Sequence, residues 1–230
     1  MDKPVGRMRI TVTDDGPYLV TGGVPLVRVE IVVNDQGESV AWRETARIET
    51  PDRYKLCRCG LSEDKPFCDM THAVEGFDGA ETAGHESYGE QAVPIDGPGV
   101  RLHDARRLCA EARFCDRAGG LWNLIERCDD PDALALAEEE AMLCPSGRYV
   151  LSADSTGLLE PEYEPSIAII DDPSLGVSGP LWVRGGIQVM DAEGAAYEVR
   201  NRMTLCRCGS SANKPFCDGS HIKAGFRDQG

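Results

Sequence analysis

Both ends of the chain alternate between apolar and polar residues and are rich in β-branched side chains. The pattern is clearest in four segments, RITVT (9–13), RVEIVV (28–33), PLWVRGGIQVM (180–190) and AYEVRNRMTL (196–205). Period-two alternation places one face of a strand in the core, and glycines between segments favour turns. The two ends are therefore predicted to be sheets of short strands.

Between the two ends the pattern changes to helical spacing. Apolar residues recur every three or four positions in RLHDARRLCAEARF (101–114), GLWNLIERC (120–128) and DPDALALAEEEAML (130–143). Asp130 or Asp132, beside Pro131, is a suitable helix start. An extended acidic linker, LEPEYEPS, follows at 159–166. The sequence thus predicts an α+β protein with a mainly helical insert between two β-rich halves.

One string of the sequence occurs twice. CRCGLSEDKPFCDMTH stands at 57–72 and CRCGSSANKPFCDGSH at 206–221, so every cysteine and histidine of the first copy recurs 149 positions later. Upstream, GPYLVTGGVPL (16–26) resembles GPLWVRGGIQV (179–189). A shared approach and a shared motif indicate a duplicated module. We expect a first half at 1–79, a cysteine-containing middle module at 80–160 and a second half at 161–230.

Composition narrows the class of protein. The 230 residues carry a formal net charge of −15, which argues against a nucleic-acid partner and is compatible with a basic protein partner. No run is apolar enough to span a membrane, and the beginning, MDKPVGRMRI, lacks the apolar stretch of an export signal. We therefore expect a soluble cytoplasmic protein, in which ten cysteines indicate metal binding rather than disulfides.

Thiolates and imidazoles are ligands for soft or borderline metals. Three cysteines and a histidine recur with identical spacing, as Cys57, Cys59, Cys68 and His72 and as Cys206, Cys208, Cys217 and His221. Zinc knuckles usually begin with Cys-x2–4-Cys, whereas the first pair here is the tighter Cys-x-Cys. If DGSH opens a helix, Cys217 and His221 face the same side. Asp218 would then be the N-cap and accept a backbone N–H from Ser220 or His221.

The repeated string resembles the motif of the CDGSH iron–sulfur, or NEET, family, C-x-C-x2-(S/T)-x3-P-x-C-D-G-(S/A/T)-H. The second copy matches throughout, whereas the first has Met70 where the family has glycine, which argues against a left-handed backbone there. The resemblance implies a [2Fe–2S] cluster in each copy, held by the three cysteines and the histidine. It also implies a β-rich body that pairs two motifs, here as a pseudo-twofold monomer.

Charged residues flank both ligand sets. Cations at Lys65 and Lys214 can offset the negative charge that a cluster gains on reduction, and Asp69 and Asp218 stand directly beside ligand cysteines. We expect these four residues to tune the cofactor. The arginines inside the two Cys-x-Cys pairs, Arg58 and Arg207, either do the same or are ordinary solvated surface charges.

Three cysteines of the middle region form a second kind of pattern. Cys109 and Cys115, in CAEARFC, and Cys144, in CPSG, resemble the C-x2-(H/A)-x2-C and distant C-P of divergent single-cluster ferredoxins. The resemblance implies a third cluster, either [3Fe–4S] or [4Fe–4S], held by these three residues. The alternative is buried cysteines that face helices. Cys128 does not fit the pattern and is expected to pack in the core or to be a spare fourth ligand.

Together these features favour an iron–sulfur protein that passes electrons or whole clusters to redox or cluster-acceptor proteins. A zinc-stabilised interaction protein is the alternative. An enzyme is not expected, because the sequence has no phosphate-binding loop, nucleophile elbow or dinucleotide fingerprint.

Overall fold

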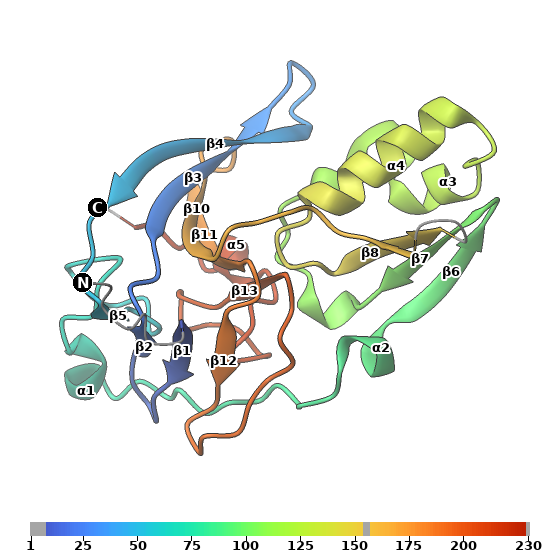
Figure 1. Ribbon diagram of the computed structural model, residues 1–230. Coiled ribbons are helices and arrows are strands. Elements are labelled where there is room, and N and C mark those ends of the chain that lie inside the picture. Colours follow the sequence, from blue (N-terminus) through green and yellow to red (C-terminus); the bar gives the residue numbers. More distant parts are fainter. Residues whose placement is uncertain (1–7, 154–156, 229–230) are drawn as a thin grey trace, which may run out of the picture.

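The computed structural model describes residues 8–153 and 157–228 as three sheets (Figure 1). The first sheet has the order β12 (Gln188–Met190), β1 (Arg9–Val12), β2 (Tyr18–Thr21), β5 (Arg53–Leu56). The second has the order β13 (Arg202–Leu205), β11 (Val177–Arg184), β10 (Ser166–Asp172), β3 (Leu26–Val33), β4 (Ser39–Ile48). The third, in the middle region, has the order β6 (Val93–Gly97), β7 (Val100–Asp104), β8 (Tyr149–Ala153), β9 (Gly157–Leu159). The export-signal expectation rests partly on residues 1–7, which lie outside the described residues.

Each repeat half lends a strand to the sheet of the other half. Strand β12, from the second half, pairs in parallel with β1, and β3, from the first half, pairs in parallel with β10. The repeat aligns β2 with β11 and β5 with β13, so the order β12-β1-β2-β5 corresponds to β3-β10-β11-β13. This is the arrangement expected of a pseudo-twofold body. Each half covers an edge that the other would leave open.

The two outer sheets share one core, to which both halves contribute. Its fully buried members include Tyr18, Val20, Leu56, Ile167, Ile169, Val189 and Leu205. In β2, buried and half-buried residues alternate, as the sequence pattern predicted. Strands β5 and β13 end at Leu56 and Leu205, and the first cysteine of each motif follows at once. The core therefore anchors the point at which each ligand loop begins.

The prediction of a mainly helical insert is wrong, because the middle region is built on a sheet. Helices α3 (Leu121–Ile125) and α4 (Pro131–Leu143) lie on one side of β6–β9 (Figure 1). Residues 101–104, expected to be helical, belong to β7, where Leu102 is buried and its neighbour Arg101 is exposed. One apolar residue between polar neighbours fits a strand as well as a helix, and pairing with β8 decides between them. Helix α4 does begin as predicted, with Asp130 accepting the backbone N–H of Asp132.

Short helical segments complete the described part of the chain. They are α1 (Thr71–Glu75), α2 (Tyr88–Gln91), η1 (Arg106–Leu108), η2 (Phe114–Gly119) and α5 (Ser220–Lys223). Within the described residues, no helix has the length and apolarity needed to cross a membrane.

The middle region packs on the second outer sheet. Phe114 lies in one apolar cluster with Trp182 of β11 and Val29 of β3. The buried guanidinium of Arg202, on β13, donates to the backbone carbonyls of Ala141, Met142 and Cys144 at 2.7, 2.7 and 2.9 Å. The loop that carries Cys144 is therefore tied to the strand that leads into Cys206.

Candidate iron–sulfur sites

The ligands of the first motif (57–72) form two close pairs. The Sγ atoms of Cys57 and Cys59 are 3.6 Å apart, and Cys68 Sγ lies 3.4 Å from Nδ1 of His72. The loop after β5 presents the first pair, and Cys68 and His72 stand four residues apart across the start of α1. Cys57, Cys59 and His72 are buried, while Cys68 is half-buried.

The second motif (206–221) repeats this arrangement. Its pairs are Cys206 with Cys208, at 3.7 Å, and Cys217 with His221 Nδ1, at 3.5 Å. Two sulfurs about 2.3 Å from one tetrahedral metal are about 3.8 Å apart, so each pair has the spacing of two ligands on one metal. Among the described residues, no three His, Cys, Asp or Glu side chains converge on a single ion. The donor set of each motif thus fits a two-metal core better than one zinc ion.

Hydrogen bonds of the same kind fix the ligand loop in both motifs. Asp218 accepts the backbone N–H groups of Ser220 and Ala212, at 3.0 and 2.8 Å, and Asp69 accepts the equivalent pair in the first motif. The predicted bond to Ser220 is therefore present, although Gly219 and not Asp218 is the N-cap of α5. Lys65 donates to the carbonyl of Ser62 in its own loop. The two aspartates thus hold the turn that carries the last two ligands.

The thiols of each Cys-x-Cys pair differ in acidity. A hydrogen bond from the Cys59 thiol, supported by backbone N–H groups and opposed by burial, lowers the pKa of Cys57 to about 6. The thiol of Cys208 and nearby backbone amides lower the pKa of Cys206 to about 6 in the same way. One thiolate in each pair is thus available to a metal near neutral pH. Burial, with Arg207 nearby, lowers the pKa of His221 to about 4, so this imidazole is neutral, as a ligand must be.

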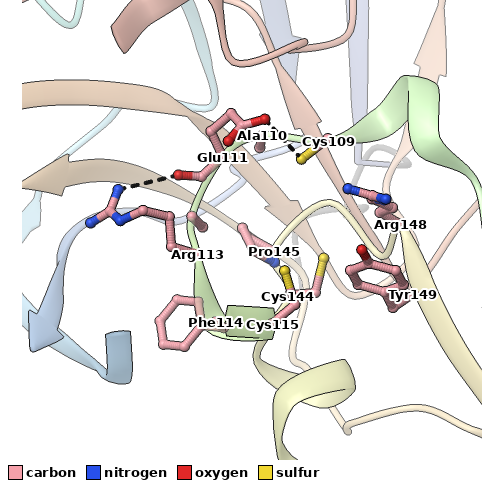
Figure 2. A pocket seen from close by; sticks show the side chains of 11 residues that line it. Cys109, Ala110, Glu111, Arg113, Phe114, Cys115, Cys144, Pro145, Arg148 and Tyr149 are labelled. Atoms are coloured by element: carbon pink, nitrogen blue, oxygen red, sulfur yellow. Dashed lines mark hydrogen bonds between the residues drawn. The ribbon is translucent and has the colours of Figure 1, made fainter. Parts of the chain in front are cut away.

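The middle cysteines also come together. Cys109, Cys115 and Cys144 line one pocket, and Figure 2 shows the sulfurs of Cys115 and Cys144 directed toward the side where Cys109 lies. Burial raises the pKa of both Cys109 and Cys115. Cys128 is absent from this lining; it is buried in the core of the middle region, and its Sγ donates to the carbonyl of Leu124. Of its two expected roles, the structure gives it the packing one.

Comparison with known families gives two matches. Residues 15–73 and 178–222 match the family described as an iron-binding zinc finger of the CDGSH type. Residues 95–154 match a divergent 4Fe–4S mono-cluster family. Two regions similar to the CDGSH type thus flank one similar to a divergent 4Fe–4S mono-cluster family, and both matches support an iron–sulfur protein. No curated protein and no solved structure gives a significant match.

The arginines inside the two CDGSH motifs are not solvated surface charges, which was one of their two expected roles. Arg58 and Arg207 are each 2% exposed. Arg58 donates to the backbone carbonyls of Thr13, Gly16 and Gly79. Arg207 donates to the backbone carbonyls of Gly179 and Ile170 and, in addition, makes ion pairs with the carboxylates of Asp228 and Asp171. Each is a buried structural cation next to two ligand cysteines, but within the described part of the chain only Arg207 pairs with carboxylates.

The two CDGSH motifs touch each other through reciprocal glycines. A Cβ on Gly60 would lie 2.7 Å from the carbonyl oxygen of Cys208, and a Cβ on Gly209 would lie 2.4 Å from that of Cys59. Both glycines have a φ of +79°. Because each contact mirrors the other, the ligand loops of the two halves meet across the pseudo-twofold relation.

Met70 adopts the left-handed conformation that the sequence argued against, with φ 74° and ψ 7°, close to the φ 84° and ψ −4° of Gly219. What separates the two positions is their surroundings. Met70 is 51% exposed, whereas a Cβ on Gly219 would lie 2.3 Å from Cγ of Glu111 in the middle region. Glycine is needed at the second position because another segment covers it. Glu111 carried no signal in the sequence, since its role depends on that contact.

Proposed function

We propose that this protein transfers electrons through one [2Fe–2S] cluster in each CDGSH motif and a third cluster in the middle region. The ligands would be Cys57, Cys59, Cys68 and His72 at the first site and Cys206, Cys208, Cys217 and His221 at the second. The paired spacing of these side chains, repeated in both motifs, carries the proposal. Bound clusters of this kind supply one-electron carriers, and we propose no catalytic reaction.

Cys109, Cys115 and Cys144 would hold the third cluster, of the [3Fe–4S] or [4Fe–4S] type. Three cysteines match the ligand number that the first type needs. The second type needs one more donor, for which the carboxylate of Glu111, 3.4 Å from Cys109 Sγ, is a candidate in the same pocket lining. This site adjoins the second CDGSH motif, where Glu111 packs on Gly219, and the second motif adjoins the first through Gly209. The order of contacts supports a relay of three centres.

Transfer of a whole cluster to an acceptor protein is a second candidate function. It is favoured by one observation, an open surface pocket that His72 lines together with Asp14, Asp15 and Phe77. A cluster ligand beside such a pocket would be a point at which a cluster is released to an acceptor.

Iron and sulfide analysis of anaerobically purified protein tests the proposal. We expect a red-brown protein with about seven or eight iron atoms per chain, and electron paramagnetic resonance signals from the [2Fe–2S] sites only after reduction. If the protein contains only about four iron atoms per chain and gives no signal when oxidised, the proposed middle cluster is contradicted, while the two [2Fe–2S] clusters remain supported. A colourless protein that contains zinc would contradict the proposal and support the zinc-stabilised interaction protein instead.

A further inference from the structure

The surfaces around the two CDGSH motifs differ at aligned positions. Leu61, Met70 and Val74 of the first motif are 47%, 51% and 85% exposed. Each stands two residues after a ligand, namely Cys59, Cys68 and His72. The aligned residues of the second motif are Ser210, Gly219 and Lys223. Large apolar side chains in water thus surround only one of two otherwise similar ligand sets.

Charge differs between the two surfaces as well. The first motif and the segment after it carry exposed carboxylates at Glu63, Asp64, Asp69, Glu75 and Asp78. At the aligned positions the second half has Ala212, Asn213, Asp218, Ala224 and Arg227. The first site therefore has apolar side chains within an acidic surround, whereas the second keeps one of the five acids.

Among residues 8–153 and 157–228, contacts from the middle region cover the second site and not the first. Besides the contact of Glu111 with Gly219, the side chain of Asn213 donates to the carbonyl of Arg107 at 3.1 Å. The backbone N–H groups of Thr82 and Ala83 both donate to the carbonyl of Lys214 at 2.8 Å. The cysteine beside this cover, Cys217, is buried, while its counterpart Cys68 is half-buried.

We propose that the first CDGSH site is a docking surface for a separate basic electron-transfer protein, and that the second site exchanges electrons only inside the chain. This rests on the proposed function above. Leu61, Met70 and Val74 form the apolar centre of the docking surface, and the surrounding carboxylates attract the partner. The complementary surface on the partner has an apolar centre surrounded by basic residues. The middle region occupies the equivalent face of the second site.

Electron exchange with ferric cytochrome c, a basic redox protein, tests this surface. The full chain is reduced anaerobically, freed of excess reductant and mixed rapidly with the probe. One electron leaves the protein for each haem iron reduced from ferric to ferrous, and no bond is made or broken. The second-order rate constant is measured over a range of ionic strength.

Two sets of substitutions place residues of the second motif in the first. The apolar set, Leu61→Ser with Met70→Gly and Val74→Lys, should slow exchange at least about fivefold at all salt concentrations. The acidic set, Glu63→Ala with Asp64→Asn and Glu75→Ala, should slow it about tenfold at low salt and flatten its salt dependence. Asp69 is kept because it holds the ligand loop.

Matched controls remove the same groups elsewhere. Leu158, 67% exposed in the middle region, is replaced by Ser. A charge control, Glu126→Ala with Asp129→Asn and Glu162→Ala, removes three exposed carboxylates away from both motifs. Both controls should stay within about twofold of the unaltered chain, because docking is local to the first site.

Two results would overturn the docking surface. One is an exchange rate unchanged by either set of substitutions, and the other is an equal loss in the controls. Iron content and visible absorption are measured for every variant. An unaltered chain that binds no iron would contradict the proposed function itself, whereas a normal iron content with an unchanged rate would contradict only the docking surface.

Discussion

The two CDGSH motifs have the same ligands, the same ligand spacing and the same internal hydrogen bonds, yet they have different surroundings. The first is open, with Met70 in water and a pocket beside His72. The second is covered by the middle region, with Glu111 on Gly219. Ligand geometry is local and survives duplication, whereas exposure depends on what packs outside the motif. Two motifs with the same ligand geometry thus have different surroundings, and the proposed docking surface rests on that difference.

The largest loss of stability should come from substitutions at the reciprocal glycine contacts, through which the two motifs meet in equivalent ways. Gly60→Ala and Gly209→Ala should each cost about 3 kcal/mol or more in the free energy of unfolding, because a Cβ meets a carbonyl oxygen at 2.7 or 2.4 Å and φ is positive. Chemical denaturation measures both. Gly76→Ala and Gly225→Ala are the controls, since their φ is also positive but nothing lies within 4 Å; each should cost only about 1–2 kcal/mol. Very unequal losses of stability in the Gly60 and Gly209 variants would show that the two contacts are not equivalent.

Exchanging the residues at positions 70 and 219 tests whether the middle region covers only the second motif. Gly219→Met should cost about 2–4 kcal/mol, because the new side chain collides with Glu111 and the backbone is left-handed. Met70→Gly should change stability by no more than about 1 kcal/mol, because strain relief opposes added freedom of the unfolded chain. Thermal melting and proteolysis of the middle region give the readouts. Equal effects at the two positions would show that cover does not distinguish the sites.

Replacing either histidine ligand should make its site harder to reduce. In His72→Cys and His221→Cys a thiolate takes the place of a neutral imidazole, and the added charge should lower the reduction potential by an amount on the order of 100 mV. Each variant should also keep its colour to lower pH, since the protonatable imidazole is gone. Protein-film voltammetry and acid titration of the visible absorption measure the two effects. An unchanged potential and acid lability would mean that the histidine is not a ligand.

The smallest expected effect is a difference in the stability that the two aspartates of the ligand loops, Asp218 and Asp69, contribute. Burial alone would raise the pKa of Asp218, but hydrogen bonds from Ser220 and Ala212 lower it below its usual value. The stability that this carboxylate contributes is therefore present above pH about 3.9 and is lost as the pH falls below it. Asp218→Asn should cost about 1 kcal/mol at neutral pH and nothing in strong acid, and Asp69→Asn, on the exposed site, should cost less. A pH series of denaturation curves tests this; a loss that persists in acid would rule out the charged hydrogen bonds as its source.

Much of the candidate site could be predicted because its ligands lie close together in the sequence. The spacing of Cys57, Cys59, Cys68 and His72 lies within sixteen residues, and its repetition made the ligand sets visible without a structure. Period-two alternation predicted the outer strands for the same reason. The middle region was harder, since residues 101–104 satisfy both strand and helix periods and only pairing with β8 assigned them to a sheet.

The sequence by itself determined the duplication, the two sets of four ligands, the three middle cysteines and the acidic charge. Only the tertiary structure decided that the halves exchange strands, that Arg58 and Arg207 are buried, and that Glu111 covers Gly219 while Met70 is exposed among the described residues. Ligand spacing is a property of a few consecutive residues, whose local backbone sets it. Burial and cover arise from segments more than a hundred residues apart, such as Glu111 and Gly219, and no local pattern specifies which segments will meet.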